Sequence, residues 1–128
     1  MDACTRAAKK ILVVEDEPTL ADNIGAYLAA QGYEVRVVYR GREALAECAA
    51  FAPDQMILDY SLPDMNGFEV FDAMCKSGCC CCCVLMTAHP HEVVAQDAAA
   101  RGIEHILFKP FALAELAHVL GTLGCARQ

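Results

Sequence analysis

The stretch "DQMILDYSLPDMNG" (residues 54–67) decides the fold class, because an apolar run leads directly into a polar loop. The apolar run at 56–58 ends at Asp59. A carboxylate beside a buried strand is costly unless another group pairs with it. The stretch therefore predicts a buried strand over 54–60 and a cationic partner for Asp59.

Four further runs of the same kind occur along the chain, and a helical pattern follows each of them. The runs are "KILVVED" (10–16), "YEVRVVY" (33–39), "CVLMTA" (83–88) and "EHILFK" (104–109). Apolar residues three or four positions apart predict helices over 19–31, around 44–48, around 68–74, over 91–101 and around 113–120. Five strands that alternate with five helices predict an α/β protein with a doubly wound parallel sheet covered on both faces.

The composition of the strands predicts their places in the sheet. The runs at 10–16, 54–60 and 83–88 each contain an uninterrupted apolar segment (11–14, 56–58 and 83–86) and fit central positions, whereas Glu34 and Arg36 interrupt 33–39, which fits an edge. Ligands of such folds bind at the carboxyl ends of the strands, near the point where the strand order reverses.

Polar residues stand at the carboxyl ends of four predicted strands: Glu15 and Asp16, Asp59, Thr87, and Lys109. Carboxylates about 4 Å apart repel by roughly 4 kcal/mol at an effective dielectric constant near 20, so a cation is needed to hold three together. Oxygen ligands select a hard ion such as Mg²⁺. Lys109 adds a second positive charge, and the Thr87 hydroxyl could bind a phosphoryl oxygen. Asp59 is then free to act as a nucleophile that forms an aspartyl-phosphate.

Each of these residues also has an ordinary structural interpretation. An acidic pair such as Glu15 and Asp16 complements the dipole of the helix that follows. Asp59 could be a turn former. The functional interpretation is favoured because all five residues fall at the same structural position of an alternating chain.

These motifs resemble the receiver domain of bacterial two-component response regulators. The resemblance covers about residues 9–124 and rests on "ILVVEDEP", "MILDYSLPDMNG", "VLMTAH" and "FKPF", in the order and spacing of the family. It implies one receiver domain over 1–128. It also implies a flavodoxin-like (CheY-like) parallel sheet with strand order 2-1-3-4-5 and five helices.

The resemblance further implies the roles of the site residues. Asp59 is expected to be the phospho-acceptor, Thr87 the switch hydroxyl and Lys109 the phosphate-binding lysine, with a cis Lys109–Pro110 bond. The expected ligands of Mg²⁺, or of Mn²⁺ as a substitute, are Glu15, Asp16, Asp59 and the backbone carbonyl of Ser61.

The expected partners also follow from the resemblance. The phosphoryl donor is a phosphohistidine on a sensor histidine kinase or a histidine phosphotransfer protein, which docks on the first helix near Leu20 and Asn23. A downstream output domain or target protein receives the signal, and a homodimer is expected through the face formed by helix 4, strand 5 and helix 5. The domain is expected to catalyse only its own phosphorylation and dephosphorylation, and so not to be an enzyme.

Two features depart from the family pattern. Ile106 stands where an aromatic switch residue is common, and strand alternation points the neighbouring His105 to the opposite face. The stretch "CKSGCCCCC" (75–83) contains formal CxxC pairs, so zinc or redox chemistry is an alternative to a structural role, with Cys83 as a small core residue. His89, two residues after Thr87, is expected near the mouth of the site.

Two other classes of function remain as alternatives. A Mg²⁺-dependent phosphohydrolase with an aspartate nucleophile usually has a second acid two residues later, where this chain has Ser61. A cysteine-rich metal-binding module lacks the usual ligand spacing. A net charge of −7 disfavours nucleic acid as a partner. The apolar run at 79–86 falls short of the roughly 20 residues of a membrane span, and no secretory signal is evident, so the expected location is the cytoplasm.

Overall fold

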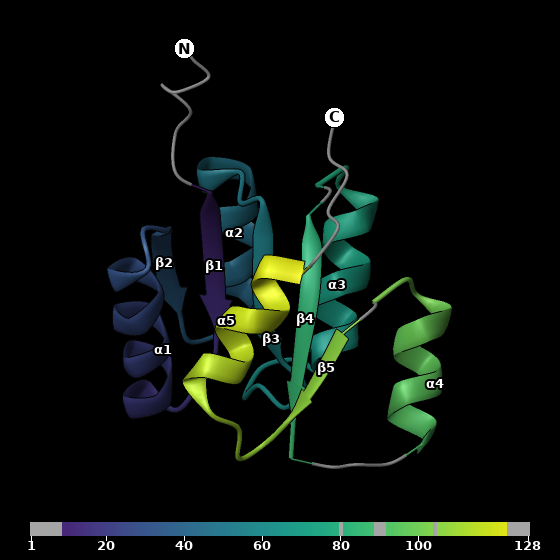
Figure 1. Ribbon diagram of the computed structural model, residues 1–128. Helices are drawn as coiled ribbons and strands as arrows, with labels where there is room; N and C mark the ends of the chain where they lie inside the picture. Colours follow the sequence, from purple (N-terminus) through teal and green to yellow (C-terminus); the bar gives the residue numbers. More distant parts are fainter. Residues whose placement is uncertain (1–8, 80, 89–91, 104, 123–128) are drawn as a thin grey trace.

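A five-stranded parallel sheet forms the centre of the computed structural model, which describes residues 9–79, 81–88, 92–103 and 105–122 (Figure 1). The strands are β1 (Lys10–Val14), β2 (Glu34–Val38), β3 (Gln55–Asp59), β4 (Cys82–Thr87) and β5 (His105–Phe108). The helices are α1 (Pro18–Ala30), α2 (Gly41–Phe51), α3 (Gly67–Lys76), α4 (Glu92–Ala100) and α5 (Leu113–Thr122). All ten predicted elements are therefore present; four of the strands are shorter than predicted, and three of the helices are longer than the predicted ranges.

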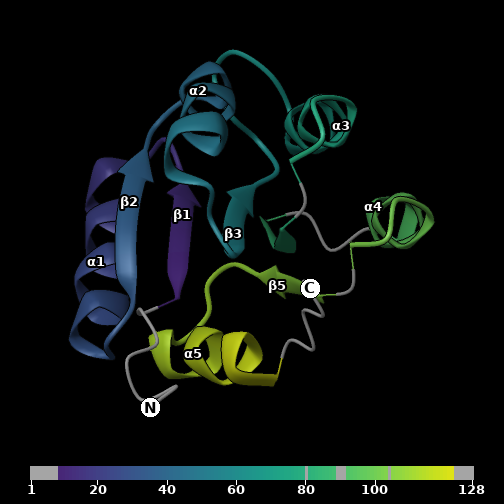
Figure 2. The ribbon, with the colours of Figure 1, turned by 90° about the horizontal axis from the view of Figure 1, so that it is seen from above.

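The strands lie in the order β2-β1-β3-β4-β5, and all neighbouring strands pair in parallel. This confirms the predicted order, with the charged strand β2 at one edge and β1, β3 and β4 inside. Helices α1 and α5 cover one face of the sheet, and α2, α3 and α4 cover the other (Figure 2). The order reverses between β1 and β3, which places their carboxyl ends side by side.

Alternate residues of the central strands feed two separate cores. Leu12 and Leu58 belong to the cluster under α2, α3 and α4, whereas Val13 and Ile57 belong to the cluster under α1 and α5. All four side chains are fully buried. Full burial of a side chain of this size contributes roughly 1.5–3 kcal/mol, so both faces of the sheet hold the strand ends in place.

Side-chain caps begin the two helices nearest the carboxyl ends of β1 and β3. The Glu17 carboxylate accepts a hydrogen bond from the Leu20 backbone N–H at 2.7 Å, and Pro18 occupies the first helical position. Asn66 and Glu69 form a reciprocal capping box at α3, with bonds of 2.9 and 2.8 Å. These caps fix the loops that border the strand ends.

Among the described residues, no helix has both the length and the apolar character needed to cross a membrane.

Candidate functional site

The predicted polar residues converge at the carboxyl edge of the sheet, the lower edge in Figure 1. Asp59 and Thr87 end β3 and β4, and Glu15 and Lys109 directly follow β1 and β5. The Lys109 backbone N–H donates to the Thr87 carbonyl at 2.8 Å, which ties the ends of β4 and β5 together. The sequence-based prediction that these residues meet at one edge is therefore confirmed.

The Lys109 ammonium group bridges two carboxylates. Its Nζ lies 2.7 Å from Glu15 Oε1 and 3.0 Å from Asp59 Oδ1. Glu15 and Asp59 are only 1% and 3% exposed, so this pairing takes place largely away from water. Two buried carboxylates therefore share one cation, which offsets only part of their charge. Sequence reasoning placed Lys109 near Asp59 but did not identify Glu15 as its nearer partner.

Glu15, Asp16 and Asp59 form a cluster in which one carboxylate oxygen from each residue lies within 4.8 Å of the others. Asp16 is exposed, so the cluster opens to solvent on one side. A set of oxygen donors with an uncompensated negative charge suits a hard divalent cation. Ser61 lies in the adjoining loop, where it forms an isolated bridge with Asn66. Its carbonyl as a fourth ligand stays a prediction.

The electrostatics of the cluster differ from those of separate side chains. Burial and then the negative charge of Glu15 raise the pKa of Asp59, and Lys109 partly opposes both; the net result is a pKa of about 6, against an ordinary value of 3.8. For Lys109, burial by itself lowers the pKa, but the hydrogen bonds to Glu15 and Asp59 raise it above its ordinary value. The site thus holds a cationic lysine beside an aspartate that is costly to ionise.

Gly67 at the start of α3 allows the loop after β3 to close tightly. Its backbone N–H donates to the Tyr60 carbonyl at 2.7 Å. A Cβ atom at this position would lie 3.0 Å from both the Asp59 carbonyl oxygen and the Tyr60 Cα. Only glycine therefore fits without a shift of the backbone next to Asp59. Sequence reasoning read "NG" as part of a loop and missed this contact.

The family model of the response regulator receiver domain matches residues 11–121. This chain belongs to that family. It is 31% identical to the transcriptional regulatory protein TrcR of Mycobacterium tuberculosis over 84% of this chain and 42% of TrcR. It is 35% identical to the luminescence regulatory protein LuxO of Vibrio campbellii over 77% of this chain and 22% of LuxO. The chain thus spans less than half the length of these two relatives.

Solved receiver structures confirm the fold. The chemotaxis response regulator CheY4 of Vibrio cholerae superposes with a TM-score of 0.83 at 29% sequence identity, over 90% of this chain and 98% of CheY4. The domain is therefore CheY-like, as the resemblance implied, and the strand-end cluster lies in a receiver domain of two-component signalling.

The departures from the receiver pattern can now be placed. Ile106 is half-buried and packs against the core under α2, α3 and α4, while Leu107 enters the opposite core. His105 is half-buried, and its orientation away from Ile106 stays a prediction from strand alternation. The Lys109–Pro110 bond is cis, also as expected. His89 lies outside the described residues.

The cysteine-rich stretch has both the structural role predicted for it and an unforeseen neighbour. Cys83 is buried in the core under α2, α3 and α4, so it is the small core residue that was expected. Cys48 of α2 approaches the same stretch and is hydrogen-bonded to Cys79. Spacing along the chain gave no signal of this contact, because the two residues lie in different elements.

Proposed function

We propose that this receiver domain accepts a phosphoryl group on Asp59 in a Mg²⁺-dependent reaction. The donor is a phosphohistidine on a sensor histidine kinase or a histidine phosphotransfer protein. The observation that carries the proposal is the bridging position of Lys109, 3.0 Å from Asp59, beside three carboxylates whose oxygens lie within 4.8 Å. A site built only to stabilise the fold would not leave two buried carboxylates with one cation.

Each residue of the cluster has a distinct task in this proposal. An ionised oxygen of Asp59 attacks phosphorus, while the bond from phosphorus to the histidine nitrogen breaks. The Lys109 ammonium and the Thr87 hydroxyl bind phosphoryl oxygens, and the hydroxyl reports the phosphorylated state. When bound, a divalent ion neutralises negative charge on the carboxylates and on the phosphoryl oxygens. Mg²⁺, or Mn²⁺ in its place, would be held by Glu15, Asp16, Asp59 and the Ser61 carbonyl.

The partner surfaces follow from the position of the site. The kinase or phosphotransfer protein docks along α1, where Leu20 is half-buried and Asn23 is exposed. The surface formed by α4, β5 and α5 contacts an output domain, a target protein or a second copy of the chain. Phe108 of β5 supports this assignment, because it is a large hydrophobic side chain with 44% of its surface exposed.

The wider role of the domain is proposed on the same basis. Residues 1–128 form a single receiver domain with a core over about 9–124, which the family match at 11–121 supports. The domain catalyses only its own phosphorylation and dephosphorylation. It acts in the cytoplasm through protein contacts, and the net charge of −7 argues against direct binding of nucleic acid.

Incubation with acetyl phosphate tests this proposal. The protein should gain one stable phosphoryl group when Mg²⁺ is present, and Asp59→Asn should abolish the gain. Asp97→Asn, at an exposed position of α4, is the matched control and should leave the gain unchanged. An adduct that persists in Asp59→Asn would contradict the proposal.

The same incubation separates a receiver from an aspartate-nucleophile phosphohydrolase. A receiver holds the phosphoryl group and releases little phosphate, since Ser61 cannot supply the acid that such hydrolases use two residues after the nucleophile. Rapid and continuous release of phosphate, with no adduct, would favour the hydrolase instead.

A further inference from the structure

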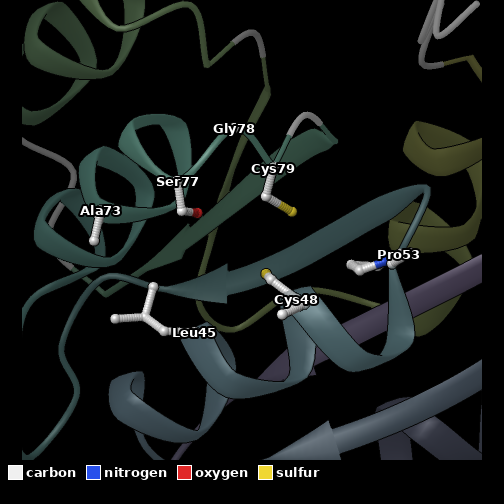
Figure 3. A pocket seen from close by; sticks show the side chains of 9 residues that line it. Leu45, Cys48, Pro53, Ala73, Ser77, Gly78 and Cys79 are labelled. Atoms are coloured by element: carbon white, nitrogen blue, oxygen red, sulfur yellow. The ribbon is translucent and has the colours of Figure 1, made fainter.

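The amino-terminal edge of the sheet, away from Asp59, carries a pocket with two cysteines in its lining. This pocket of about 440 Å³ opens between α2, α3 and the connections that follow them, and Leu45, Pro53 and Cys79 are among its lining residues (Figure 3). Pro53 precedes β3 and Asp59 ends it. At about 3.3 Å per residue, the pocket is roughly 20 Å from the carboxylate cluster.

Two thiols face one another in this pocket. Cys48 projects from α2 and Cys79 from the segment after α3, and their sulfur atoms are turned toward each other (Figure 3). The two thiols share a hydrogen bond. Cys48 is 5% exposed, whereas Cys79 is half-buried at the wall of the pocket. A small molecule in the pocket therefore reaches Cys79 before it reaches Cys48.

The other described cysteines are poorer partners for Cys48. Cys81 is half-buried, and its charge raises the pKa of Cys48 less than Cys79 does. Cys83 is buried on β4 within the core, and Cys75 is exposed on α3. Cys82 is disulfide-bonded. Cys79 is thus the cysteine that both faces Cys48 and shares a hydrogen bond with it.

Burial separates the chemical roles of the two thiols. It raises the pKa of the Cys48 thiol well above the ordinary range, and negative charge on Cys79 raises it further. A thiol reacts with oxidants much more slowly than a thiolate does, so the raised pKa slows direct reaction of Cys48 with a peroxide. Its contact with Cys79 nevertheless suits Cys48 to the second step of an oxidation, because there it meets a neighbouring sulfur that has already reacted.

We propose that Cys48 and Cys79 form an oxidation site that takes a hydroperoxide as its co-reactant. The Cys79 thiolate attacks one peroxide oxygen and the O–O bond breaks; with hydrogen peroxide and one proton, this yields a sulfenic acid and water. The Cys48 sulfur then attacks the Cys79 sulfur, and the hydroxyl group leaves with the Cys48 proton as a second water. The net change converts two thiols and one hydrogen peroxide into a disulfide and two waters.

The bond would connect α2 to the segment between α3 and β4. Helices α2 and α3 cover the same face of the sheet, so the cross-link restrains that helical layer and not the edge that carries Asp59 (Figure 2). Oxidation should therefore leave phosphorylation of Asp59 unchanged. A negative result in the oxidation test can therefore be told apart from a negative result in the phosphorylation test.

Disulfide mapping tests the proposal. The full chain is reduced, desalted, exposed to hydrogen peroxide, alkylated and digested without reductant. The expected product is a peptide pair joined through Cys48 and Cys79, distinct from any bond of Cys82. Formation of this bond should raise the Tm by roughly 10 °C, since it closes a loop of about 30 residues.

Single substitutions assign the two roles. In Cys48→Ser, Cys79 should accumulate as a sulfenic acid that dimedone traps, whereas in Cys79→Ser the Cys48 thiol should resist oxidation. Cys75→Ser is the matched control and should still form the bond. Far-UV circular dichroism shows whether each variant folds, and the wild-type peptide map decides the pairing without any variant.

Three results would overturn the proposal. The first is a Cys79–Cys81 bond in place of the Cys48–Cys79 bond. The second is a Cys48 that is still a free thiol while Cys79 is oxidised, shown by complete alkylation of Cys48 once the protein is denatured. The third is stoichiometric zinc in the reduced protein that shields both thiols from alkylation, which would make them metal ligands instead.

Discussion

Replacement of Asp59 by Asn should stabilise the protein at neutral pH when divalent ions are absent. The Asp59 carboxylate is 3% exposed, and the negative charge of Glu15 lies close by. Asn has nearly the same shape and does not ionise. The substitution therefore removes the cost of a buried charge, and the pKa of Asp59 already includes its contact with Lys109.

The pKa values set the size of the effect. Asp59 titrates at about 6 in the folded protein, against an ordinary value of 3.8. At 1.36 kcal/mol per pH unit, the difference corresponds to roughly 3 kcal/mol. The folded pKa is raised, so Asp59 favours the folded state most when it is protonated. This contribution to the free energy of unfolding is fully present below pH 3.8 and is lost as the pH rises through about 6. Asp59→Asn should thus gain roughly 3 kcal/mol at pH 7.5 and about 1.5 kcal/mol at pH 5.

Urea unfolding in EDTA measures the free energy of unfolding of both proteins at the two pH values. The chain has no Trp, so far-UV circular dichroism is the suitable signal. Asp97→Asn serves as the exposed control and should change stability by less than about 0.5 kcal/mol. An Asp59→Asn variant that is no more stable than wild type at pH 7.5, or whose advantage grows as the pH falls, would refute the reasoning.

Three further predictions concern other parts of the molecule. Lys109→Met should lower the free energy of unfolding by about 2–4 kcal/mol in EDTA at pH 7.5, because two buried carboxylates lose their cation; unchanged urea unfolding would contradict this. Ala52→Gly should raise that free energy by about 0.5–1 kcal/mol, since Ala52 has a φ of 53° at the end of α2. Ala49→Gly, inside the helix, should lower it by about 1 kcal/mol. A Tm of Ala52→Gly below that of Ala49→Gly would contradict this. In a partner-binding assay with phosphorylated protein, Gln96→Arg on α4 should uncouple binding more than Ile106→Ala, and equal effects would count against the role assigned to α4.

Much of the fold was predictable because its signals are local. Each apolar run such as 56–58 is bounded by polar residues, and the strands must be parallel because helices separate them. In a parallel sheet the carboxyl ends share one edge, so the convergence of Glu15, Asp59 and Lys109 followed from their positions in the sequence. The strands end one or two residues earlier than predicted, because polar residues such as Asp16 belong to the loops.

The unpredicted features depend on contacts between distant residues. That Lys109 lies nearer to Glu15 than to Asp59 is a matter of side-chain conformation, on which the sequence gives no information. The approach of Cys48 to Cys79 depends on how α2 packs beside α3, and neither helix pattern specifies it. The receiver family sets the position of the site, and the packing of this chain sets its local electrostatics.

The most direct test of the central claim is to locate the phosphoryl group after incubation with acetyl phosphate. Borohydride reduction marks an aspartyl-phosphate permanently, and peptide mapping then identifies the modified residue. The account predicts a mark on Asp59 alone, present with Mg²⁺ and absent with EDTA. A mark on any other residue, or a mark on Asp59 that does not depend on a divalent ion, would contradict it.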